Sequence, residues 1–172
     1  MMKSLGRALS IVPMFAAITS IAAPAAAQTG LHYEYAAQVD CGMANGDIAA
    51  SNGIYLTTVN IHNPGPPAAF RWKVASATPI TTPGPNQGGP VSGFSGFHLG
   101  SDQAVRIDCT AVRDRNTASG ILNPAFLSVF LVIQSNLPLD VVAVYSAMPI
   151  AGPNGGPIVV LHLERVPARP MG

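Results

Sequence analysis

Charged side chains are scarce in this chain of 172 residues, where Asp, Glu, Lys and Arg together make up 10%. A typical soluble domain carries about a quarter. Nine basic residues stand against eight acidic ones, and the closest approach to a basic cluster, Arg113 and Arg115, is interrupted by Asp114. The chain therefore lacks the basic excess that favours binding to nucleic acid or to an anionic membrane surface.

Cysteine is also rare, with only Cys41 and Cys109 in the sequence. Two free thiols or a metal-binding pair are alternatives, but the spacing matches no zinc pattern. In an oxidising compartment the simple interpretation is one structural disulfide between them. Such a bridge also removes the free thiolate that a cysteine nucleophile needs.

Recognisable catalytic motifs are missing as well. The segment Gly93-Phe94-Ser95-Gly96 misses the Gly-x-Ser-x-Gly nucleophile spacing by one position. Phosphate-binding loops and dinucleotide fingerprints are absent. The sequence therefore predicts no catalytic residue and no cofactor, and it favours a protein that is not an enzyme.

A weak candidate for metal binding is a pair of His-x-Glu motifs, one near each end of the chain. Residues two apart on a strand share a face, so pairing of the terminal strands would bring two imidazoles and two carboxylates together as zinc-type ligands. The competing interpretation is ordinary polar decoration of an outward strand face. The four residues are His32, Glu34, His162 and Glu164.

The first 27 residues have the three parts of a secretory signal peptide. Lys3 and Arg7 form a positive region, an apolar stretch follows, and Ala25 to Ala27 supply small residues before Gln28. An uncleaved membrane anchor is the alternative, but the apolar stretch is short for a span of about 20 residues. Cleavage would leave residues 28–172 as a single domain with no membrane span, located in the periplasm or outside the cell.

Alternating apolar and polar residues dominate the remaining chain and predict β-strands. Turn formers separate them, since the chain contains 17 glycines and 16 prolines. The phase places both cysteines on inward positions near strand ends and makes Trp72 a core aromatic. The predicted strands cover 31–39, 54–62, 70–74, 91–99, 104–109, 126–133, 139–147 and 158–166.

Three segments depart from this pattern. Residues 78–90 form a long loop rich in proline and glycine, either a surface excursion or, together with Trp72, a small-ligand or carbohydrate site. Residues 113–124 are polar and irregular, and a helical turn there is left open. Residues 126–133 are apolar without alternation, which predicts a central strand buried on both faces or, alternatively, a strand exposed for a partner.

The order of elements predicts an all-β fold, best described as an immunoglobulin-like antiparallel β-sandwich of about seven to eight strands. A small β-barrel is the alternative. Three stretches, Val59 to Pro64, Leu139 to Tyr145 and Glu164 to Pro167, resemble an uncharacterised family of small bacterial exported proteins. The resemblance covers most of the chain after residue 27 and implies a bacterial exported β domain, without an activity.

The sequence thus favours an exported, non-catalytic β-sandwich module that acts as an interaction or structural protein of the bacterial envelope or exterior. Expected partners are another envelope protein or a second copy paired through an edge strand. The alternatives are a small-ligand or carbohydrate binding protein, and a metal-dependent envelope enzyme using the two His-x-Glu motifs.

Overall fold

The computed structural model describes residues 30–45, 52–77, 88–149 and 159–172, with the side chains at 159–161 left out. The predicted signal peptide at 1–27 and most of the predicted long loop, 78–87, lie outside the described residues. In chain order the elements are β1 (Tyr33–Ala44), β2 (Gly53–His62), β3 (Ala68–Ser76), β4 (Ser95–Leu99), β5 (Ala104–Ile107), α1 (Cys109–Ala118), β6 (Phe126–Ser135), β7 (Asp140–Pro149), β8 (Val159–Arg165) and β9 (Arg169–Pro170).

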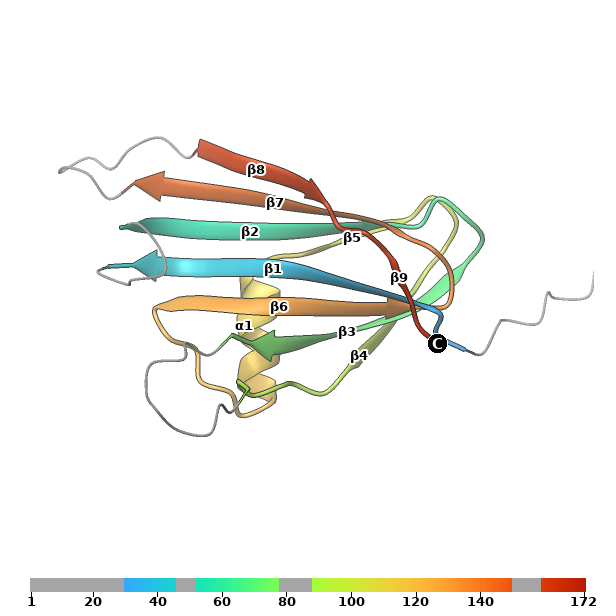
Figure 1. Cartoon of the computed structure of the whole chain (residues 1–172), viewed down its shortest axis with the longest axis horizontal. Helices are drawn as coiled ribbons and strands as arrows, with labels where there is room; N and C mark the ends of the chain where they lie inside the picture. The colour runs from blue at the N-terminus through green and yellow to red at the C-terminus, as the bar shows by residue number, and fades with distance from the viewer. Residues whose placement is uncertain (1–29, 46–51, 78–87, 150–158) are drawn as a thin grey trace, which may run out of the picture.

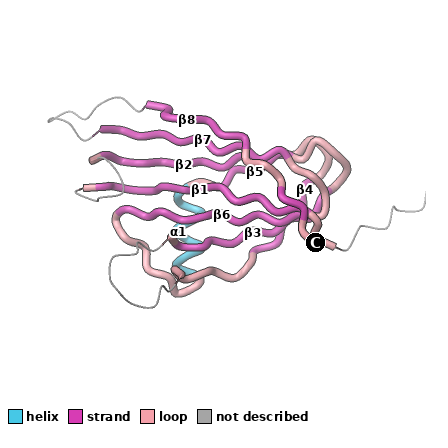
Figure 2. Tube along the Cα trace, viewed as in Figure 1, coloured by secondary structure: helices cyan, strands magenta, loops and turns pink. Residues whose placement is uncertain are grey.

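Within the described residues, nine strands form one antiparallel hydrogen-bonded network: seven follow the order β4-β3-β6-β1-β2-β7-β8, and β5 and β9 pair off this path with β2 and β1. Figure 1 shows these strands side by side, with α1 packed on one face, and Figure 2 shows how little of the chain is helical. The structure confirms the prediction of an all-β fold. Whether the fold is an immunoglobulin-like sandwich or a small barrel stays a prediction, as does the single domain.

The sheet forks between β1 and β2. The two strands pair only from Cys41 opposite Leu56 to Ala44 opposite Gly53. Beyond that point β5 pairs with the second half of β2, and β9 pairs with the start of β1. The side chain of Thr57 bridges the fork: its Oγ1 accepts from the backbone N–H of Asp40 at 3.0 Å and donates to that residue's carbonyl at 3.2 Å.

Alternation along the strands builds the core, as the sequence predicted. On β1, residues Tyr35, Ala37, Val39 and Cys41 are buried, and Trp72 on β3 is only 7% exposed. Because strand side chains alternate between the two faces of a sheet, the intervening residues of β1 point outwards. The core cluster also includes Val59 and Ile61 of β2, Val129 and Leu131 of β6, Val141 of β7 and Val112 of α1.

The prediction that 126–133 is buried on both faces is wrong, although β6 is central, between β3 and β1. Leu127, Val129, Leu131 and Ile133 are buried on one face, whereas Phe130 on the other is 44% exposed. The apolar run was misleading because most of its outward positions, Phe130 among them, are also apolar.

The strand predicted over 104–109 ends early, and a helix follows that the alternation did not predict. Strand β5 stops at Ile107, and the carboxylate of Asp108 caps α1 by accepting a hydrogen bond from the N–H of Ala111 at 3.1 Å. Aspartate is among the preferred N-cap residues. The helix buries only Val112 and Asn116, one turn apart, so it leaves little amphipathic signal in the sequence.

The predicted disulfide is confirmed: Cys41 and Cys109 are bonded, with their sulfurs 2.06 Å apart. The bridge joins the second half of β1 to the first residue of α1, rather than two strand ends. Next to it, Gly42 has a φ of +101°, a conformation that side-chain-bearing residues rarely adopt. A Cβ there would also overlap the carbonyl oxygen of Ala125. Arg113 donates to the carbonyls of Cys41 and Ala125, both at 3.1 Å, and so fastens α1 to this corner.

Candidate functional site

The two His-x-Glu motifs do not come together. Strand β8, which carries His162 and Glu164, pairs with β7, and β2 and β7 separate it from β1. The assumption that the first and last long strands pair is therefore wrong. His32 precedes β1, and the short β9 lies beside the beginning of that strand, with Arg169 opposite Glu34.

Glu34 instead belongs to a series of side-chain hydrogen bonds that crosses three strands. The side-chain amide of Gln134 donates to Glu34 Oε2 at 2.9 Å. The guanidinium of Arg71 donates through two nitrogens to Gln134 Oε1, at 3.0 and 2.8 Å. Arg71 also lies 4.1 Å from the ring centroid of Phe94, a cation–π contact. These contacts give the outward side chains of β1, β6 and β3 a structural role.

Among the described residues, no group of three or more His, Cys, Asp or Glu side chains is placed to hold a metal ion. The nearest approach to such a group surrounds His62, the last residue of β2. Its Nδ1 lies 3.6 Å from Asp140 and its Nε2 lies 3.8 Å from Asp102. Asp140 in turn pairs with Arg165 at 2.7 Å, so these contacts link the ends of β2, β7 and β8.

A hollow of about 350 Å³ lies next to the fork, across β1, β2, β7 and β8. We refer to it as the outer hollow. Its position follows from the alternation that builds the core, because the outward residues of β1 meet the side chains of its neighbours at the fork. The lining residues are Gln38, Asp40, Tyr55, Thr57, Tyr145, Ser146, His162 and Glu164.

One side of the outer hollow is organised around the carboxylate of Asp40. Its Oδ1 accepts a hydrogen bond from the hydroxyl of Ser128 at 2.7 Å. The amide nitrogen of Gln38 lies 3.3 Å from both carboxylate oxygens. Both donors are neutral, so they orient the carboxylate and leave its negative charge in place. An ionised carboxylate offers about four acceptor positions, and some remain for a ligand.

The opposite side consists of Tyr145 with two residues of β8. The Tyr145 hydroxyl donates to Glu164 Oε2 at 3.0 Å. The ring of His162 stacks on that of Tyr145, with centroids 6.0 Å apart and planes 25° apart. Burial, followed by the hydrogen bond to the Glu164 carboxylate, raises the pKa of Tyr145 to about 12. The hydroxyl therefore keeps its proton at neutral pH and remains a donor.

The chemistry of the outer hollow is that of a hydrogen-bonding site with aromatic walls. It presents two carboxylates, an amide, two hydroxyl-bearing residues besides the tyrosines, and three aromatic rings. No Lys or Arg side chain is among the lining residues, so the site repels phosphate and other anions. These groups can hydrogen-bond to a ligand and pack against its apolar faces.

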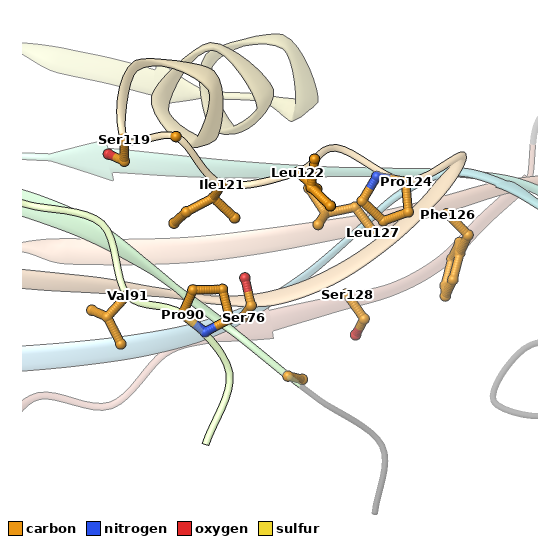
Figure 3. Close-up of a pocket in the computed structure, with 12 residues that line it drawn as sticks. Ser76, Pro90, Val91, Ser119, Ile121, Leu122, Pro124, Phe126, Leu127 and Ser128 are labelled. Atoms are coloured by element: carbon orange, nitrogen blue, oxygen red, sulfur yellow. The ribbon is translucent and has the colours of Figure 1, made fainter. Parts of the chain in front are cut away.

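A second, apolar hollow of about 590 Å³ lies between the loop after α1 and the segment that follows the gap at 78–87. Figure 3 shows Ile121 and Leu122 on one side, with Pro90 and Val91 across from Ile121. Leu122 is 88% exposed. Ala77, another lining residue, is the last one described before the gap, so this hollow borders the predicted loop at 78–90.

Sequence reasoning placed a possible carbohydrate site on that loop together with Trp72, but Trp72 is buried in the core and faces away from solvent. The outer hollow was missed. A signal for it was present: Gln38 and Asp40 occupy the outward phase of the first strand, and Tyr145 interrupts an apolar strand. What the sequence lacked was the strand order that brings these positions together with His162.

Both cysteines are in the disulfide, so neither is a thiol nucleophile. No helix within the described ranges combines the length and hydropathy needed to cross a membrane.

Comparison with known proteins identifies no family. No family model matches the chain, and no curated protein matches it. One solved structure, described as "Crystal Structure of Thermotoga maritima 1070", aligns with 81% of this chain and 100% of its own, at 13% identity and a TM-score of 0.39. A likeness at that level supports no conclusion about fold or function.

Proposed function

We propose that this protein is an exported, non-catalytic binding module of the bacterial envelope or exterior, and that the outer face of its sheet is the binding surface. The observation that carries the proposal is the outer hollow, where hydrogen-bonding and aromatic side chains from four strands line one depression. Antiparallel β folds commonly present such faces or their edges to partners.

Export is supported by two independent features. The residues before Gln28 have the charge and hydropathy pattern of a secretory signal peptide. The Cys41–Cys109 disulfide is typical of proteins that mature in an oxidising compartment. Fractionation of the bacterium with N-terminal sequencing tests this part: the expected product starts at Gln28 outside the cytoplasm, and a cytoplasmic chain retaining Lys3 would contradict it.

A binding role rather than catalysis is supported by the contacts of the carboxylates. Asp108 caps α1, Glu34 accepts from Gln134, and Asp140 pairs with Arg165. In each case the carboxylate holds neighbouring elements of the fold together.

Site-specific photo-cross-linking in the living bacterium tests the binding surface. A benzoylphenylalanine at Ser146, which lines the outer hollow, should give a discrete adduct on irradiation. The matched control is the same probe at Leu122, which is 88% exposed on the other hollow. Adducts from the control but none from Ser146 would contradict the proposal, as would no adduct from either position together with no ligand bound by the purified protein.

Two strand edges support the proposal that the partner is an envelope protein or a second copy. Strands β4 and β8 end the strand order, so each has one edge without a neighbouring strand in the described network. Edge strands are the natural sites for pairing with another chain. On β8, Leu163 is 62% exposed. Disulfide trapping between Leu163→Cys copies distinguishes self-association from binding to another molecule.

A further inference from the structure

We propose that the outer hollow binds a saccharide, through stacking on Tyr145 and His162 and through hydrogen bonds from sugar hydroxyls to Asp40 and Glu164. This inference rests on the proposed function and names the ligand class for the same surface.

The aromatic part of the site matches the apolar faces of a sugar ring. A pyranose presents C–H groups above and below the ring and hydroxyls around its rim, so it packs against an aromatic face while its edge stays polar. The Tyr145 ring is partly buried against the core, and the exposed His162 ring stacks on it. Packing against the core thus restricts the Tyr145 ring, which reduces the entropy lost when a ligand binds.

The polar part matches the hydroxyls at the rim. Sugar hydroxyls donate well to carboxylates, and hydrogen bonds to a charged acceptor are the stronger kind. Asp40 is held by Ser128 and Gln38, and Glu164 is held by Tyr145. Both carboxylates are therefore oriented before the ligand arrives. Neutral donors hold them without neutralising them, and their remaining lone pairs are available to the ligand.

The composition of the lining argues against other ligand classes. A phosphate or carboxylate ligand would meet two carboxylates and no Lys or Arg side chain. A purely apolar ligand would meet no aliphatic side chain, since the eight lining residues are polar or aromatic. The volume of about 350 Å³ is at the small end of the range for ligand sites, about 300–1,000 Å³. A single sugar unit, or the end of a longer glycan, is the occupant of that size.

A primary amine is the strongest competitor, because carboxylates beside aromatic rings also attract cations. The test therefore uses the exported protein, labelled with ¹⁵N, and two sets of probes. The first set is the methyl glycosides of glucose, galactose, mannose and N-acetylglucosamine, and the second is ethylammonium chloride. We expect at least one glycoside to shift the amide signals of Gln38, Tyr145 and His162 in a saturable way.

Variants assign the binding to the site. His162→Ala and Glu164→Gln each remove one contact from an exposed position, and each should weaken glycoside binding by about tenfold or more. The matched controls are Phe130→Ala and Glu34→Gln, an exposed aromatic and a carboxylate on the same outer face but outside the hollow. Both controls should bind as the unaltered protein does. Tyr145→Phe keeps the ring and should bind more weakly than the unaltered protein because Glu164 loses its orienting donor.

Three results would overturn the saccharide assignment: no saturable shift with any glycoside up to its solubility limit, equal shifts with ethylammonium, or equal weakening in the Phe130 and Glu34 controls. The proposed function fails separately. A protein adduct from a probe at Ser146 without glycoside binding would retain the binding surface and remove the sugar, whereas the absence of both would remove the two proposals together.

Discussion

Reducing the disulfide between Cys41 and Cys109 should lower the free energy of unfolding by about 4 kcal/mol. The two cysteines are 68 positions apart, and cross-linking a loop of that span removes conformational entropy from the unfolded chain worth about 4 kcal/mol. Domains of this size have a total stability of about 5–15 kcal/mol. The disulfide therefore accounts for a large part of the free energy that separates the folded from the unfolded state.

Urea unfolding followed by tryptophan fluorescence measures this difference directly. Trp72 is the single tryptophan in the chain, and it is buried against the core, so its emission should shift to longer wavelength on unfolding. The reduced protein should unfold at lower urea, with a larger dependence on denaturant because its unfolded state is more expanded. In a thermal experiment the midpoint should fall by about 8–16 °C.

The control is the double variant Cys41→Ala with Cys109→Ala, which should resemble the reduced protein and should not respond to the reductant. If the oxidised and reduced proteins had unfolding free energies within about 1 kcal/mol, the loop-entropy argument would be refuted. Mass spectrometry that found two free thiols in the exported protein would refute the bridge itself.

Three other perturbations should have separable effects. Asn63 is fully buried and its amide donates to three backbone carbonyls that join two turns, so Asn63→Ala should cost about 3 kcal/mol by urea unfolding; a loss below about 1 kcal/mol would contradict this accounting. Asp108→Ala should cost about 1 kcal/mol by removing the cap of α1, and Asp108→Asn should recover most of it, whereas equal losses would point to charge rather than capping. Because the pKa of Tyr145 is raised from 10.0 to about 12, its contribution to stability is fully present below pH 10 and is lost as the pH rises towards 12. Tyr145→Phe should lose less stability between pH 10 and pH 12. If the variant and the unaltered protein gave identical profiles of stability against pH, Tyr145 would not be the cause of the loss.

The inner face of the sheet was predictable because it depends on local alternation. The outward or inward direction of Tyr35, Val39 and Cys41 follows from a period of two along one strand, and the structure confirms it. The same reasoning failed where alternation carries no information. In β6 both faces hold apolar residues, so Phe130 was assigned to the interior although it is 44% exposed.

The helix was missed for a related physical reason. Most of the stability of a helix in a protein comes from its packed face, and α1 packs through only Val112 and Asn116. Its start is set by one capping residue, Asp108, and by the disulfide to β1. Asp108 is followed by a segment with little apolar periodicity, and this combination resembles the end of a strand. The sequence alone therefore favoured a strand that continued to Cys109.

The sequence by itself determined that the chain is built from strands, which side of β1 faces the core, and that the two cysteines meet. These properties depend on the order of residues along one segment and on having two sulfurs to pair. Only the tertiary structure decided which strands are neighbours. It placed β8 beside β7 rather than β1, separating His162 from His32 and bringing it to Tyr145. Strand order reflects contacts between distant segments, and no local pattern shows that Gln38 and Asp40 would meet Tyr145 and His162 at the outer hollow.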